Sequence, residues 1–161
     1  MIKYAKKDNF YSIFPMGEIP NDWEELTKEE YDKHFEKTFD ELKVEKLSEL
    51  TAITSKFDNQ LVNTDMIIKS SLGFTINADL RSQLNIHRLI NISAEPVSFI
   101  IADNTTVDLS LAQLNILISE CEENMQYLFD LKQSYKKQIA DATTKEELDA
   151  IEIKFEMLDF S

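Results

Sequence analysis

The stretch that decides the fold is residues 109–140, LSLAQLNILISECEENMQYLFDLKQSYKKQIA, which contains no glycine and no proline. Its apolar residues recur at steps of three and four, as on one face of an α-helix. The stripe consists of Leu114, Leu117, Cys121, Leu128, Leu131 and Tyr135, widened by Ile118, Met125 and Ile139. Such a helix is about 45 Å long at about 1.5 Å per residue. Its apolar face needs a second long element or another chain, which indicates docking and assembly rather than chemistry.

A second long helix is predicted from Lys28 to Leu61. Thr27 and Glu30 have the spacing of a capping box, in which each side chain satisfies a backbone N–H at the start of the helix. Apolar residues then follow at mostly three- and four-residue steps: Tyr31, Phe35, Phe39, Leu42, Leu47, Leu50, Ile53, Phe57 and Leu61. The five-residue step after Leu42 is the place for a kink. Antiparallel pairing with the helix over 109–140 would bury both stripes.

Short strands and two shorter helices complete the expected elements. Strand-prone runs flank polar turns in three hairpins, at 2–14 with its turn at 6–9, at 66–77, and at 97–109. A helix from Leu80 to Ile92 would be capped by Asn77 or Asp79. Capping boxes also precede the helix over 109–140 and a last helix from about 145 to 158; their residues are Ser110 with Gln113, and Thr143 with Glu146.

These elements predict an α+β fold that is predominantly helical, with a long antiparallel helical pair, β hairpins and a shorter helix. The domain boundary is expected after residue 26. Residues 1–26 form a β-hairpin-like segment, because the run after its second strand holds Pro15, Gly17 and Pro20. Residues 27–161 form the helical domain with its hairpins.

Charge limits the classes of partner. Thirty acidic residues against seventeen basic ones give a net charge of −13, which repels the phosphates of nucleic acids and anionic membranes. Residues 18–50 hold twelve acids and five lysines, a net charge of −7. A solvated helix face is one interpretation; a nucleic-acid mimic that fills a basic cleft on another protein is the alternative, although the interspersed lysines oppose it. No apolar run reaches the length of a membrane span, and no signal peptide is expected.

Aromatic residues are concentrated near the amino terminus, where eight of the sixteen lie within the first thirty-nine residues. One interpretation is a small β flap that packs its aromatic side chains on the next helix. The functional interpretation is an exposed patch that binds a partner, since Trp and Tyr are favoured anchors in interfaces. The candidate partner-binding residues are Phe10, Tyr11, Phe14, Trp23, Tyr31 and Phe35.

No group of residues predicts catalysis, a cofactor or a metal site. His34 and Glu30 are one helical turn apart but are too few for zinc, and a salt-bridged, solvent-facing histidine is the expected role. His87 is expected to be half-buried, and Cys121 to be an inert buried thiol. Asp103–Asp108 lacks the glycine and glutamate of a calcium loop, so a turn is expected there. The chain is therefore predicted not to be an enzyme.

Several segments after Leu47 resemble carboxy-terminal domains of unknown function found in bacteriophage and prophage tail genes. The similar segments are 73–79 (GFTINAD), 82–86 (SQLNI), 99–104 (FIIADN), the helix start at 109–110, and 139–148 (IADATTKEEL). They cover roughly the last two thirds of the chain and bring no catalytic residues to carry over.

The resemblance implies a tail-fibre or tail-fibre-assembly protein. It would bind a fibre or tail subunit, in the host bacterial cytoplasm during assembly or as a component retained on the virion tail. The rival class is the acidic inhibitor described above, encoded by a mobile element and directed at a host or defence enzyme. A third alternative is a structural protein that forms homo-oligomers and needs no foreign partner.

Overall fold

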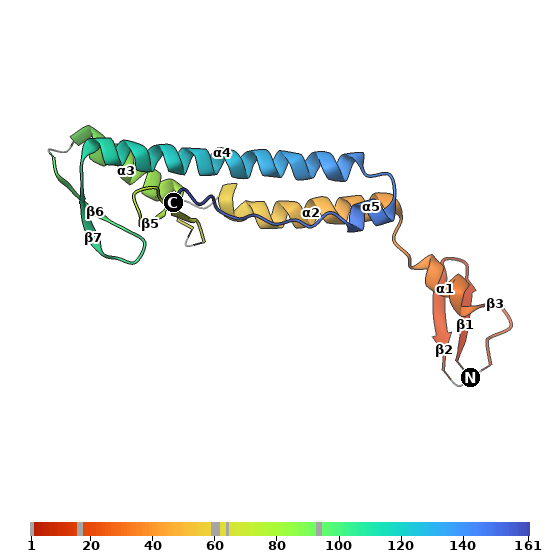
Figure 1. Ribbon diagram of the computed structural model, residues 1–161. Coiled ribbons are helices and arrows are strands. Elements are labelled where there is room, and N and C mark those ends of the chain that lie inside the picture. The colour runs from red at the N-terminus through yellow and green to blue at the C-terminus, as the bar shows by residue number, and fades with distance from the viewer. Residues whose placement is uncertain (1, 16–17, 59–61, 64, 93–94) are drawn as a thin grey trace. The chain divides into compact units, whose positions relative to one another are not determined.

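The computed structural model describes residues 2–15, 18–58, 62–63, 65–92 and 95–161 (Figure 1). Helices combine with small antiparallel strand pairs, so the fold is α+β. Two compact units divide at Glu41 and Leu42, and each is described by itself. The predicted boundary after residue 26 lies earlier, because the helix that follows it packs on the amino-terminal sheet.

The amino-terminal unit is built on a three-stranded sheet. Strands β1 (Lys3–Lys7) and β2 (Phe10–Phe14) pair in antiparallel fashion, and Asp8 in the turn between them has a φ of 52°. The predicted first hairpin is therefore confirmed. Strand β3 (Glu24–Leu26), which the sequence analysis did not predict, pairs with the other side of β1, so the strand order is β2-β1-β3.

The predicted single helix from Lys28 to Leu61 is wrong. The Thr27–Glu30 capping box is present, but helix α1 covers only Lys28–His34, and helix α2 begins anew at Phe39 and runs to Asp58. Thr38 Oγ1 accepts a hydrogen bond from Glu41 N, and the Glu41 carboxylate accepts one from Thr38 N at 2.7 Å. This second capping box satisfies backbone N–H groups at the start of a new helix, so it competes with continuation of the first helix. The chain is helical through Leu42 to Leu47, where a kink was expected, and residues 59–61 lie outside the described residues.

Helices α3 and α4 of the second unit begin where the sequence predicts. Helix α4 (Leu111–Asp141) has the Ser110–Gln113 capping box. Helix α3 (Leu80–Ile92) is capped by Asp79, whose Oδ1 accepts from Ser82 N at 2.8 Å. Both predictions are confirmed, with Asp79 rather than Asn77 as the cap.

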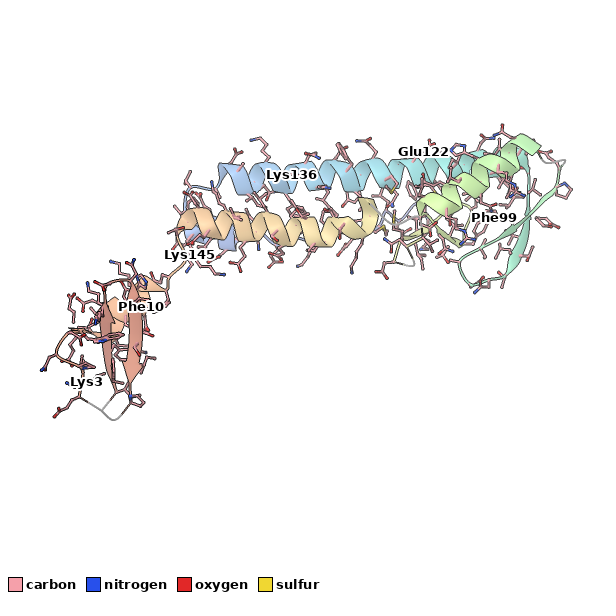
Figure 2. All side chains as sticks on the ribbon, turned by 180° about the vertical axis from the view of Figure 1, so that it is seen from behind. Lys3, Phe10, Phe99, Glu122, Lys136 and Lys145 are labelled. Carbon is pink, nitrogen blue, oxygen red and sulfur yellow. The ribbon has the colours of Figure 1, made fainter. Side chains whose placement is uncertain are left out.

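Two hairpins pack with α3 and the first half of α4. They are β4 (Ile67–Lys69) with β5 (Thr75–Asn77), and β6 (Val97–Ile100) with β7 (Thr106–Leu109). A bond from Ala102 N to Thr75 O links them, and Figure 2 labels Phe99 in the second. The core here contains Ile68, Ile76, Ile86, Phe99, Leu114 and Leu117.

Helix α2 lies alongside α4 in both views (Figure 1, Figure 2). Lys43 Nζ, near the start of α2, donates to Ala140 O near the end of α4 at 2.9 Å, so the two helices run in opposite directions. Leu50 and Thr54 are the buried residues of α2. The helix is shorter than α4, and α3 packs along the remainder of α4.

The predicted helix from 145 to 158 is also wrong. Helix α5 ends at Asp149 (Lys145–Asp149), and its N-cap is Thr144, whose side chain accepts from Glu147 N, in place of the predicted Thr143–Glu146 box. Residues 151–158 form no helix. Ile151, Ile153, Phe155 and Met157 alternate with charged residues, which is the period of an extended segment and not of a helix.

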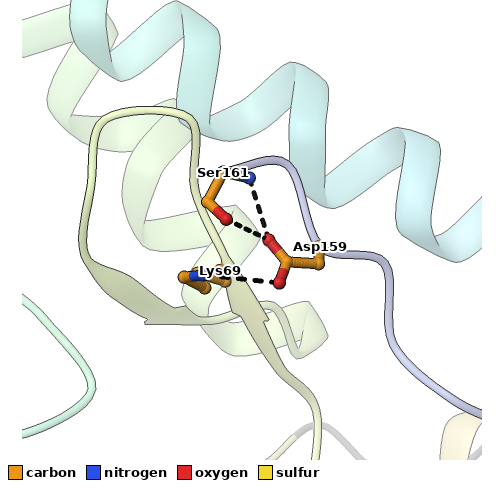
Figure 3. Close-up of polar contacts among 3 residues, drawn as sticks. All are labelled: Lys69, Asp159 and Ser161. Carbon is orange, nitrogen blue, oxygen red and sulfur yellow. Dashed lines mark hydrogen bonds and ion pairs between the residues drawn. The ribbon is translucent and has the colours of Figure 1, made fainter.

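This extended segment is tied to the rest of its unit at three levels. Tyr135 on α4 bonds through its hydroxyl to the backbone of Lys154, and Asn124 Oδ1 accepts from Leu158 N at 2.9 Å. Lys69 O on β4 accepts from Phe160 N at 2.8 Å. The Lys69 ammonium lies 3.4 Å from the carboxylate of Asp159, which also accepts two hydrogen bonds from Ser161 (Figure 3). We call residues 151–161 the strap, because these contacts fix the segment to α4 and β4.

Candidate partner-binding surface

The strand register divides the aromatic side chains of the amino-terminal sheet between two faces. Tyr4 lies opposite Ile13, and Lys6 opposite Tyr11. Because side chains alternate along a strand, these four share one face, and helix α1 packs on it through its ring contacts with Tyr4 and Tyr11. We call it the α1 face. Ala5, Phe10, Ser12 and Phe14 belong to the opposite face.

Three of the six predicted partner-binding residues meet on the α1 face. Tyr11 lies 6.3 Å from Tyr31 and 5.7 Å from Phe35, measured between ring centroids, and Tyr31 lies 5.0 Å from Phe35. These are separations at which aromatic pairs attract. Tyr31 is half-buried, whereas 58% of Phe35 is exposed. The cluster therefore has a packed centre and an open rim.

The other three predicted residues do not join this cluster. Phe14 and Trp23 form a separate edge-to-face pair at 5.6 Å. Phe10 is 72% exposed and lies at the far end of the same strand (Figure 2). The six residues thus divide into a cluster of three, a pair and the separate Phe10, and do not form one continuous patch.

Two members of the α1-face cluster were missed by the sequence analysis. Tyr4 lies 5.0 Å from Tyr31, and His34 stacks nearly parallel on Tyr11 with ring centroids 3.4 Å apart. The register of the predicted hairpin could have placed Tyr4 and Tyr11 on one face, because Tyr4 is next to Ala5, Tyr11 is next to Ser12, and Ala5 lies opposite Ser12. His34 lies one helical turn after Tyr31, which was the signal for its place in the cluster.

A shallow hollow of about 300 Å³ borders the stacked Tyr11 and His34. Its other lining residues are Lys6, Glu24, Leu26, Glu30 and Lys33. The hollow is therefore lined mostly by charged side chains beside two stacked rings, a composition similar to the polar rim of a protein interface.

The charges around the sheet are largely paired. Lys6 lies 3.0 Å from Glu24, Lys3 lies 3.1 Å from Glu25, and Lys7 pairs with Asp22. The hydrogen bond that Lys6 donates to Glu24 raises the pKa of Lys6, and the one that Lys7 donates to Asp22 lowers the pKa of Asp22. All these groups are at least partly exposed to solvent, so each pair adds little stability. Of the three pairs, Lys6 with Glu24 lines the hollow.

Elsewhere, the groups that could do chemistry are either buried or dispersed. Cys121 is buried in the core, and burial, with the nearby Glu120 charge, raises the pKa of its thiol to about 12, so it is a poor nucleophile. His87 is exposed and not half-buried as predicted, with Nε2 3.4 Å from Glu122 on α4. Asp103 Oδ1 accepts from Thr105 N within the predicted turn.

Within the ranges given above, no group of three or more His, Cys, Asp or Glu side chains is placed to hold a metal ion. The same part of the chain contains no helix long and apolar enough to cross a membrane.

Comparison with known families finds one match, over residues 41–152, to a family described as a domain of unknown function, DUF4376. The match begins at Glu41, one residue before the second compact unit. The aromatic sheet and residues 153–161 of the strap lie outside it. No curated protein and no solved structure matches the chain.

Proposed function

The chain belongs to the DUF4376 family of domains of unknown function, and we propose that it is a non-enzymatic docking protein that binds a phage tail-fibre or tail subunit. In this proposal it serves as an assembly chaperone or remains on the virion as a component of the tail. The tail assignment comes from the sequence resemblance described above. The docking role comes from the surface of the amino-terminal unit.

The observation that carries the docking role is the exposed rim of the aromatic cluster. Phe35 keeps more than half of its surface exposed while its neighbours Tyr11 and Tyr31 hold it in place. A rigid aromatic side chain beside a charged rim is the usual composition of an interface hot spot. The cluster belongs to the amino-terminal unit, and its residues lie outside the family match. We therefore expect this surface to be specific to the partner of this chain and not shared by the whole family.

The acidic-inhibitor alternative gains less support. A nucleic-acid mimic needs carboxylates that are free to replace phosphates. In the amino-terminal sheet, Asp22, Glu24 and Glu25 each pair with a lysine of β1. Binding to a basic nuclease that disappears at moderate salt would favour the inhibitor over the docking protein.

The proposal is tested by co-expression with a phage tail-fibre subunit. We expect the fibre subunit to become more soluble and to co-purify with the wild-type chain. The Phe35→Ala variant should weaken this complex at least tenfold, since anchor truncations cost about 2 kcal/mol or more.

Phe129→Ala is the matched control, because Phe129 is 55% exposed on α4 in the other unit. It should leave the complex unchanged. Unchanged fibre solubility with no co-purification would contradict the proposal, and so would equal loss of binding in the two variants.

A further inference from the structure

The two edges of the amino-terminal sheet are protected to different degrees. Edge strands of natural proteins are usually short or carry charges, which prevents pairing with other chains. Strand β3 satisfies both conditions, since it has three residues and two of them are Glu24 and Glu25. Strand β2 satisfies neither, because Phe10–Phe14 reads FYSIF and contains no charge and no proline. Its outer side has no strand partner among the described residues.

The side chains of β2 are symmetric about Ser12. Phenylalanine lies two residues away on either side, and the large apolar Tyr11 and Ile13 lie next to it. If two copies pair in antiparallel fashion with Ser12 opposite Ser12, each Phe10 meets a Phe14 and each Tyr11 meets an Ile13. Aromatic pairs and pairs of an aromatic with a β-branched residue are favourable across antiparallel strands.

The exposed surface and the charge near this edge also favour a second copy. Phe10 is 72% exposed and Ile13 is 48% exposed, so pairing would remove apolar surface from water. The chain as a whole has a net charge of −13, yet residues 2–15 carry three lysines against one acid, Asp8. Repulsion between carboxylates of the two copies is therefore weak along this edge. The antiparallel arrangement also moves the Asp8 turn of one copy toward the sheet end that carries Lys3 in the other.

We propose that two copies of this chain join through their β2 edges, with Ser12 on the two-fold axis, to form one continuous sheet with three strands from each copy. Such a contact uses the same surface on both partners and closes as a dimer. Both α1 faces then lie on the same side of the joined sheet, so the dimer presents two aromatic clusters side by side. A five-residue edge buries less than the roughly 1,200–2,000 Å² of a standard interface, so the dimer should depend on concentration, with a Kd of roughly micromolar to millimolar.

Sedimentation velocity over a range of protein concentrations tests the dimer. We expect the full chain to shift from monomer to dimer, and Ile13→Lys to raise the Kd roughly 10- to 100-fold, since the lysine enters twice per dimer and protects the edge. Phe129→Lys, at an exposed apolar position on α4, should leave the Kd unchanged. A monomer at all concentrations, or a dimer that Ile13→Lys does not weaken, would overturn the proposal.

Disulfide cross-linking tests the register and does not depend on how well Ile13→Lys folds. Cβ atoms directly opposite one another on antiparallel strands are about 4.5–5.5 Å apart, so Ser12→Cys should form an intermolecular disulfide under mild oxidation. Ser48→Cys, at an exposed serine of α2, should stay largely monomeric. Cys121 is buried and adds little background.

Equal cross-linking of the two cysteine variants, or none in either, would count against the proposed register. Hydrogen exchange tests the other possible partner of the β2 edge, which is a strand of a fibre subunit. If the amides of β2 become protected only when a fibre subunit is added, the edge takes a foreign strand and the dimer is refuted.

Discussion

The two compact units differ in what their apolar residues do. The unit over 42–161 has a core of large buried side chains, in which Leu114, Leu117 and Ile86 are fully buried, although others such as Phe129 are exposed. In the unit over 1–41 Ala5 is the one fully buried hydrophobic residue among those described, and the aromatic side chains cluster near the surface. A core of this kind stabilises a scaffold, whereas surface rings leave contact area for another molecule. The difference separates the part of the chain that holds the fold from the part proposed to bind.

The largest expected effect is on the scaffold. Leu117→Ala removes a fully buried side chain from the core of the second unit and should lower the free energy of unfolding by about 2–5 kcal/mol. Denaturation followed by far-ultraviolet circular dichroism measures this, because the long helices dominate the signal. Ile116→Ala, at a neighbouring residue that is 40% exposed, is the control and should change the midpoint little.

Trp23, the one tryptophan of the chain, makes this experiment diagnostic. Its fluorescence reports on the amino-terminal unit alone, so its transition should not move in Leu117→Ala. If the fluorescence and dichroism transitions move together, the two units unfold as one and the division between scaffold and binding unit is wrong.

Loss of the strap contact should have the next largest effect. Asn124 is fully buried and accepts from Leu158 N, so Asn124→Ala leaves this N–H without its acceptor and should cost about 1–3 kcal/mol. We also expect faster proteolysis within residues 151–161. Asn115→Ala is a matched change on the same helix at an exposed site; equal sensitivity of the two variants would show that Asn124 does not hold the strap.

Changes in the aromatic cluster should shift the unfolding transition that is followed by Trp23 fluorescence. Tyr31→Ala removes ring contacts with Tyr4, Tyr11 and Phe35, each worth about 0.5–1.5 kcal/mol. The Trp23 transition should therefore move to lower denaturant while the dichroism transition stays in place. Phe35→Ala should move it less, because that ring is more exposed. A larger shift for Phe35→Ala would mean that Phe35 is a structural residue and not a free contact.

The smallest effect concerns pH. A hydrogen bond from Thr27 N lowers the pKa of Glu30, and one from Lys7 lowers that of Asp22. A carboxyl group whose pKa is lower in the folded chain stabilises the fold above its ordinary pKa, near 4, and that contribution is lost as the pH falls through the folded-state value. The midpoint of the Trp23 fluorescence transition should therefore move to slightly lower denaturant concentration as the pH drops below about 4.

The Glu30→Gln variant shows how much of this pH dependence comes from Glu30. Its amide oxygen can still accept from Thr27 N but does not titrate in this range. The variant should be less sensitive to acid than the wild-type chain. An unchanged acid response would show that the Glu30 cap contributes nothing to it.

Strong local signals were sufficient for much of the fold. The apolar stripe with the Ser110–Gln113 box predicted α4, and polar turns between strand-prone runs predicted the hairpins. The break after His34 also had a local signal, since Thr38 and Glu41 repeat the spacing of Thr27 and Glu30. The continuing helical period of the apolar residues concealed it.

The candidate surface was predictable in composition but not in arrangement. The sequence shows that aromatic residues gather near the amino terminus, but their division between two faces depends on register. A shift of one residue would move every side chain to the other face. Strand β3 forms the charged edge of the sheet and leaves β2 as the uncharged one. Its three residues are too few for the sequence pattern to predict a strand.

The amino-acid sequence by itself determined the long helix, its cap, the hairpins and the acidic charge, because these depend on neighbours a few positions apart. The tertiary structure decided which aromatic rings meet, which edge of the sheet is unprotected, and where the strap binds. Those contacts join residues far apart in the chain, such as Asn124 with Leu158 and Lys69 with Phe160. They form only when the packing of the whole unit has brought the backbones together.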